Sequence, residues 1–243
     1  MSTILFLGAL LGVIVLVLSW LLRGSSASAG PARPPLPPLV IDETPDPPVG
    51  FGYKMAWLAI RSEDPRSVLE ALRLEDVVPA NWRSGVTAAY RYGEEWVFVT
   101  PVVSGWVLCV GHSLPSLYSP TGCPAWKDFM QALATRFADV QYFANHRVSS
   151  YAAWGRYRNN RFLRAYAAAD DPMINEGEKT SEEIELGFDF ATPENLEPGP
   201  PGEEDVMSLA GAWSVDPTRL EERGLGPGVG WVGRLHLNPG RAR

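Results

Sequence analysis

Residues 151–168 read YAAWGRYRNNRFLRAYAA, two runs of strand-forming residues separated by an Asn-Asn pair. Two segments, Tyr151–Arg158 and Arg161–Ala168, flank Asn159 and Asn160, which tolerate the positive φ angles of a tight two-residue turn. The pattern therefore predicts a β-hairpin. Side chains alternate along a strand, so the first segment has two faces: Tyr151, Ala153, Gly155 and Tyr157 share one, and Ala152, Trp154, Arg156 and Arg158 share the other.

Similar local signals predict the remaining strands and helices. Runs rich in Val, Phe, Trp and Tyr predict strands at residues 53–60, 96–103, 106–110, 140–144 and 231–237. Helix starts are marked by Asp64-Pro65, by Pro124, by a capping box at residues 180–183 and by Asp216-Pro217, and residues 203–213 form a further helix. Regular βαβ alternation is missing, so we expect one α+β domain with mainly antiparallel strands and several helices.

The N-terminus predicts a membrane anchor. Residues 4–22, ILFLGALLGVIVLVLSWLL, contain no charged side chain and would form a helix roughly 28 Å long, enough to span a bilayer once. A cleaved secretory signal is the alternative, because Ala27-Ser28-Ala29 resembles a cleavage site, although the residues before the apolar run include no Lys or Arg. We assign residues 1–23 to the transmembrane anchor.

The rest of the chain divides into a linker, a domain and a tail. Residues 24–50 are rich in Pro, Ser and Gly and predict an extended linker, residues 51–237 have a globular composition, and residues 238–243 form a tail. The basic residues nearest the span are Arg23 and Arg33, on its C-terminal side. The positive-inside rule favours an inner-membrane protein whose domain faces the cytoplasm, with the periplasm as the alternative.

Charge is distributed unevenly along the domain. Residues 170–205 contain thirteen Asp and Glu against one Lys, a net charge of −12 in a chain whose total is −7. Such a field favours a basic protein partner and disfavours nucleic acid. The expected contact residues are Glu182, Glu183, Glu185, Phe188, Asp189, Phe190, Glu203, Glu204 and Asp205, with Trp154 as an aromatic surface anchor. Two alternatives are a solvated acidic loop and internal pairing with the arginines at positions 147, 156, 158, 161 and 164.

The chain has few residues that indicate chemistry. The three histidines lie far apart and have no second His or Cys at ligand spacing, so we expect no metal site and no cofactor. Glycine-rich residues 224–233 are interpreted as a loop, and no sequence motif of a hydrolase or nucleotide-binding protein occurs. A nucleophilic site built from Cys109 or Ser113 with His112, His146 and an acid remains an alternative. Whether Cys109 and Cys123 form a disulfide stays open.

Three stretches carry a resemblance to a known group of proteins. They are DVQYFANHRVSSYAAWGRYRNNRFLRAYA, EGEKTSEEIELGFDF and EEDVMSLAGAWSVDP, within residues 139–217. This region resembles bacterial immunity proteins that neutralise antibacterial toxins of type VI or contact-dependent secretion. The resemblance implies a protein-binding module that is not an enzyme, and it assigns no binding residue.

The expected function combines these features. A membrane-anchored immunity protein would occlude a cognate toxin with its acidic surface, and a toxin with a basic cleft, such as a nuclease, would complement that charge. Two functions of other classes remain as alternatives: a scaffold of the cell envelope, and a hydrolase with the Cys/His site described above.

Overall fold

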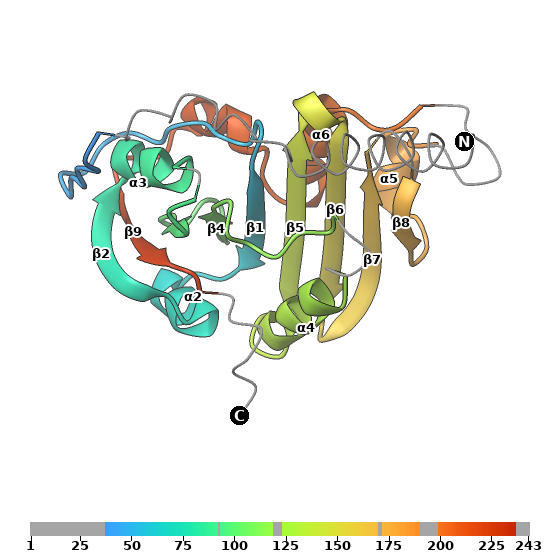
Figure 1. Cartoon of the computed structure of the whole chain (residues 1–243), viewed down its shortest axis with the longest axis horizontal. Helices are drawn as coiled ribbons and strands as arrows, with labels where there is room; N and C mark the ends of the chain where they lie inside the picture. Colours follow the sequence, from blue (N-terminus) through green and yellow to red (C-terminus); the bar gives the residue numbers. More distant parts are fainter. Residues whose placement is uncertain (1–36, 92, 119–122, 170–171, 190–198, 237–243) are drawn as a thin grey trace, which may run out of the picture. The chain divides into compact units, whose positions relative to one another are not determined.

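The computed structural model describes residues 37–91, 93–118, 123–169, 172–189 and 199–236. Within them, nine strands form one sheet in the order β2-β9-β3-β4-β1-β5-β6-β7-β8 (Figure 1), and every neighbouring pair is antiparallel. The strands are β1 (Ala56–Arg61), β2 (Glu75–Asn81), β3 (Trp96–Val99), β4 (Trp106–Val110), β5 (Asp139–His146), β6 (Tyr151–Arg158), β7 (Arg161–Ala168), β8 (Pro172–Glu176) and β9 (Val229–Arg234). The predicted α+β class with antiparallel strands is confirmed.

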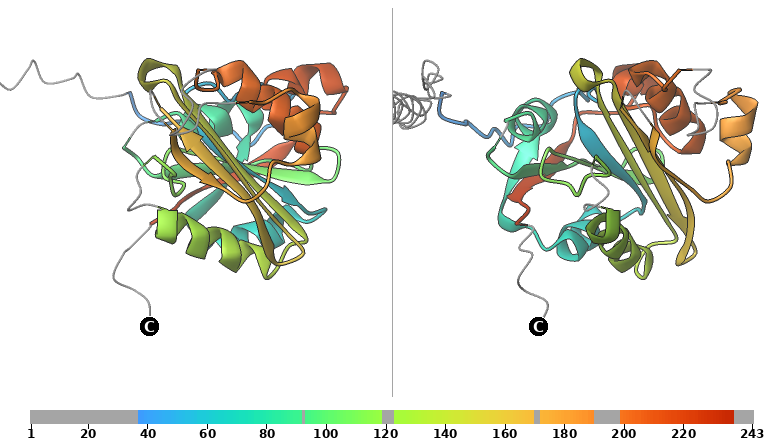
Figure 2. Two further views of the ribbon diagram at one scale, coloured as in Figure 1. Left: turned by 90° about the vertical axis from the view of Figure 1, so that its right-hand side faces the viewer. Right: turned by 45° about the vertical axis from the view of Figure 1, so that its right-hand side comes forward.

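Helices lie on both faces of this sheet (Figure 2). They are α2 (Pro65–Leu72), α3 (Trp82–Ala89), α4 (Cys123–Ala134), α5 (Ser181–Glu185) and α6 (Glu203–Trp213), with the 3₁₀ helices η1 (Arg147–Ser149) and η2 (Pro217–Arg223). Apolar residues of α3, α6 and η2 join one core cluster, and those of α2 and α4 join the other. The sheet is therefore the middle layer between two helical layers.

The predicted hairpin forms β6 and β7. Asn159 and Asn160 have φ angles of 51° and 60°, and Arg158 pairs with Arg161 across the two-residue turn. The alternation of side chains also follows the prediction. Ala152 and Trp154 pack in the core cluster that contains α6, whereas Tyr151, Ala153 and Tyr157 pack in the cluster that contains α4.

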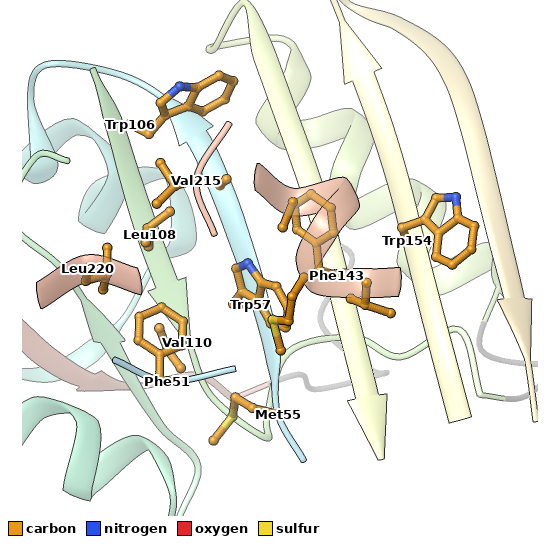
Figure 3. Packing of buried hydrophobic residues seen from close by; sticks show 14 of the residues in the cluster. Phe51, Met55, Trp57, Trp106, Leu108, Val110, Phe143, Trp154, Val215 and Leu220 are labelled. Carbon is orange, nitrogen blue, oxygen red and sulfur yellow. The ribbon is translucent and has the colours of Figure 1, made fainter. Parts of the chain in front are cut away.

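Aromatic rings join the two halves of the sheet at its centre. Trp57 on β1 stacks on Phe143 on β5 with ring centroids 5.2 Å apart, and Figure 3 shows the two rings side by side. Trp213 of α6 packs on the same Phe143 ring at 5.6 Å. Burial of such large apolar surfaces is the main favourable contribution to folding, so these rings fix α6 on the sheet.

The start of the compact unit differs from the predicted boundary at residue 51. It begins at Leu39, and the apolar side chains of Leu39, Ile41 and Val49 pack against the core. Asp46 also accepts hydrogen bonds from the backbone N–H groups at the start of α3, at 2.7 and 3.1 Å. The last part of the predicted linker thus belongs to the domain, because side-chain caps and apolar contacts hold it there.

The proposed anchor lies outside the described residues. Among residues 37–236 as the structure describes them, we find no helix with the length and apolar character needed to cross a bilayer.

Four elements are additional to those predicted: β2, α3, β8 and the short η1. The glycine-rich segment 224–233 is also only partly a loop, because β9 begins at Val229. Trp82 begins α3 and is 1% exposed, since its ring packs edge-on against Phe98 at 5.8 Å.

Gly155 determines how closely α4 packs on the sheet. A Cβ atom at this position would overlap the ring of Trp126 on α4. We therefore expect Gly155→Ala to lower the free energy of unfolding by about 1–3 kcal/mol through overpacking. Urea unfolding measures this change. Gly226→Ala is the matched control, because its Cβ would meet no atom within 4 Å; an equal loss in both variants would contradict the packing argument.

Candidate functional site

The predicted docking surface centres on α5, and the start of this helix is held by the predicted capping box. The Thr180 hydroxyl accepts from the backbone N–H of Glu183 at 3.2 Å, and the Glu183 carboxylate accepts from the backbone N–H of Thr180 at 2.8 Å. The indole N–H of Trp213 on α6 donates to the same hydroxyl at 3.2 Å. These bonds satisfy donors at the helix N-terminus and connect α5 to α6.

The side chain of Glu183 faces inward from α5 toward Trp154, and neither residue is accessible to a partner. Their exposed fractions are 1% and 0%. The Glu183 carboxylate accepts from Arg164 Nε at 2.9 and 3.1 Å and from Trp154 Nε1 at 3.0 Å. A buried charge requires such pairing. This corrects the sequence prediction that both side chains contact a partner.

Arg164 connects this carboxylate to the last strands of the sheet. Its Nη1 donates to the Asn175 side chain at 2.7 Å and to the Glu176 carbonyl at 3.0 Å, both on β8. Beside it, the rings of Trp154 and Tyr166 stack at 4.5 Å. The buried guanidinium therefore contacts β8 and α5 at once.

Phe188, another predicted contact residue, is also structural. It is 7% exposed and packs on the Trp154 ring with centroids 5.8 Å apart. Because Phe188 is buried against Trp154, the sequence prediction of an exposed contact is corrected here too.

A second ion pair lies next to the first. Arg156 Nη2 contacts Asp139 at 2.6 Å, and its Nη1 contacts Glu182 at 3.4 Å. The guanidinium also lies over the Trp213 ring at 5.2 Å. The alternative of internal pairing thus holds for Arg156 and Arg164, whereas Arg147 and Arg161 are exposed.

The remaining predicted residues differ in exposure. Glu185, Asp189 and Glu204 are exposed; Asp189 lies 3.2 Å from Lys179. Glu203 and Asp205 are half-buried, and Asp205 accepts from the Gly202 N–H at 2.7 Å. Phe190 lies outside the described residues. Sequence reasoning did not identify the two large apolar side chains that α5 and its last turn expose: Ile184, 64% exposed, and Leu186, 40% exposed.

A cleft of about 640 Å³ lies at one end of the central strands of the sheet, where β1 begins and β5 ends. Its walls come from the start of β1, the loop after β4, the end of β5 with η1, the start of β6 and Leu235 after β9. Figure 1 shows the loop after β4 passing in front of β1 and β5. The volume is typical of small-molecule sites.

Hydroxyl groups occupy one wall of the cleft. Tyr142 is fully buried, and the Tyr151 hydroxyl lies 3.4 Å from Ser116 Oγ. The ring of Tyr118 packs edge-on against Tyr151 at 5.2 Å. Burial raises the pKa of Tyr142 and of Tyr151, so both remain protonated hydrogen-bond donors at neutral pH.

His112 and His146 come from separate segments to the same cleft. Burial lowers the pKa of His112, and the nearby His146 lowers it further, so the neutral imidazole is favoured. Ser149 Oγ lies 3.3 Å from His146 Nδ1. The structure thus brings together two histidines that the sequence placed far apart.

The proposed nucleophiles do not complete a hydrolytic site with them. Cys109 does not line the cleft; it is fully buried in β4, and burial raises the pKa of its thiol. Ser113 lines the cleft, but its hydroxyl donates to the Glu95 carbonyl at 3.2 Å. A nucleophile needs a hydrogen-bonded base, and neither residue shows one here.

Cys109 and Cys123 are both free thiols, and Cys123 is buried at the start of α4. Within the described ranges, no group of three His, Cys, Asp or Glu side chains is arranged to hold a metal ion.

Comparisons of this chain with models of protein families, with curated proteins and with solved structures found no match. The geometry of α5 and of the cleft is therefore the basis for proposing a function.

The buried ion pair yields a stability prediction. Glu183→Gln should lower the free energy of unfolding by about 3–5 kcal/mol, because Arg164 would stay buried without its counter-charge. Urea unfolding measures the change. Glu222→Gln is the matched control. It removes the carboxylate of an exposed ion pair in which Glu222 is 61% and Arg219 65% exposed, and it should lower the free energy of unfolding by less than about 1 kcal/mol. Similar losses in the two variants would contradict the assigned role of Glu183.

Proposed function

We propose that this chain is a membrane-anchored protein-binding module: an immunity protein that neutralises an antibacterial toxin by occluding it with the acidic surface around α5. Residues 4–22 would hold it in the inner membrane, with the domain on the cytoplasmic side. The observation that carries the proposal is the exposure of Ile184 and Leu186 among carboxylates, on a helix whose underside is fixed by a buried ion pair.

The exposed side chains of α5 and its neighbours would contribute both to the affinity and to the association rate of a partner. Apolar side chains at the centre of an interface supply much of the affinity, and Ile184 and Leu186 would take that place. Glu185, Asp189 and Glu178 are exposed around them and would attract a basic partner and speed its association. Because the Arg164–Glu183 pair already orders α5, binding would lose less conformational entropy.

Protection of bacterial cells tests the proposal. The full chain is co-expressed with the toxin candidate encoded by the gene next to its own, and survival is counted. We expect the wild-type chain to protect. The variant Glu178→Lys/Glu185→Lys/Asp189→Lys should bind the toxin at least about tenfold more weakly and protect poorly, because its α5 surface would repel a basic partner.

A matched variant controls for net charge. Glu43→Lys/Glu63→Lys/Glu221→Lys makes the same change in charge at exposed positions away from α5 and should protect like the wild type. Equal protection by both triple variants would contradict the α5 surface. Killing that is unaffected by the wild-type chain would contradict the immunity function itself.

A further inference from the structure

The cleft near η1 is separate from the proposed docking surface. Most of its buried side chains, among them Tyr142, Tyr151 and Leu114, belong to the core cluster of α2 and α4, whereas Phe188 beneath α5 belongs to the other cluster. A ligand in the cleft and a protein on α5 would therefore contact different faces of the sheet, and the two sites can be tested separately.

One buried hydroxyl in the cleft has no partner in good hydrogen-bond geometry. Tyr142 is fully buried and lines the cleft, and its hydroxyl makes no hydrogen bond within 3.5 Å to the described residues, although Tyr151, Ser116 and the Leu117 backbone lie close enough to perturb its pKa. An unsatisfied buried polar group has a cost of about 1–3 kcal/mol, and such groups in native proteins usually bind water or a ligand. The Tyr142 hydroxyl thus marks a position for a hydrogen-bond acceptor.

The other polar groups of the cleft are mainly donors. Lys54 supplies an ammonium group, and His112, His146 and the hydroxyls of Ser116 and Tyr151 can all donate. Among the described lining residues, Glu95 is the one carboxylate, and it contacts His236 Nδ1 at 2.8 Å. A cleft with several donors and one carboxylate that is already in contact with His236 favours an anionic group.

The rest of the lining is apolar. Met55, Ala56, Leu114, Ala144 and Leu235 contribute carbon surface, and the Tyr118 ring, 50% exposed, stands at the rim. Small-molecule sites combine such apolar walls with a few polar groups that fix orientation. The ligand therefore needs an apolar or aromatic body as well as its anionic end.

We propose that this cleft binds a small organic anion. Its phosphate or carboxylate group accepts hydrogen bonds from Tyr142 and the histidines and pairs with Lys54, and its apolar body lies against Met55, Leu114 and Leu235. Phosphate monoesters and carboxylates share this chemistry, and the choice between them is part of the test.

Calorimetric titration of the full chain in detergent tests the site with three probes that share one ring: phenyl phosphate, benzoate and neutral benzyl alcohol. We expect one of the two anions to bind at least tenfold more tightly than benzyl alcohol, and the stronger anion identifies the head group. Lys54→Met should lower the affinity for that anion about tenfold or more, since hydrogen bonds to charged groups are stronger than those between neutral groups.

Tyr142→Phe separates ligand binding from stability. It removes a hydroxyl that makes no well-formed hydrogen bond to the described residues, so the urea midpoint should change little, while affinity for the anion should drop about twofold to tenfold. Tyr157→Phe on the same sheet face, outside the lining, is the matched control and should bind like the wild type. Equal binding of all three probes, no binding of either anion, or unchanged affinity in Tyr142→Phe would overturn the proposal.

Discussion

The buried ion pair between Arg164 and Glu183 is the constraint on which the end of the sheet depends. Two buried charges, at most 2% exposed, are stable only when they are paired. The pair therefore keeps α5 packed against β7, and Arg164 also binds β8 through Asn175. A helix of five residues is not stable in water by itself. The hydrogen bonds and the ion pair of Glu183 stabilise this short helix, so the solvent-facing side of α5 is an ordered surface.

Local signals in the sequence predicted much of the fold. The Asn159-Asn160 turn and the caps at Asp64, Thr180 and Asp216 all form as expected, because each depends on neighbouring residues alone. The edge strand β2 was missed because Pro79 weakens its strand pattern, although proline is tolerated at a sheet edge. Helix α3 was missed because Gly85 interrupts it; a Cβ there would overlap the Phe98 ring.

The candidate sites were harder to predict, because their geometry depends on distant partners. Trp154 shares its strand face with Arg156 and Arg158, which suggested that this face is exposed. Arg156 is nevertheless buried, because it forms an ion pair with Asp139, seventeen residues away in the sequence. The acidic segment likewise contains Glu183, which faces inward, and Glu185, which faces solvent, two positions apart. The cleft brings Lys54 together with residues near position 145, and no local pattern indicates such a meeting.

The hydrogen bonds and the ion pair of Glu183 order α5. Amide hydrogen exchange followed by mass spectrometry tests this directly. The N–H groups of Ile184, Leu186 and Phe188 donate to backbone carbonyls, so they should exchange slowly in the wild type. In Glu183→Gln they should exchange rapidly while β5 and β6 stay protected. Rapid exchange of α5 in the wild type, or equal protection in both proteins, would contradict the account.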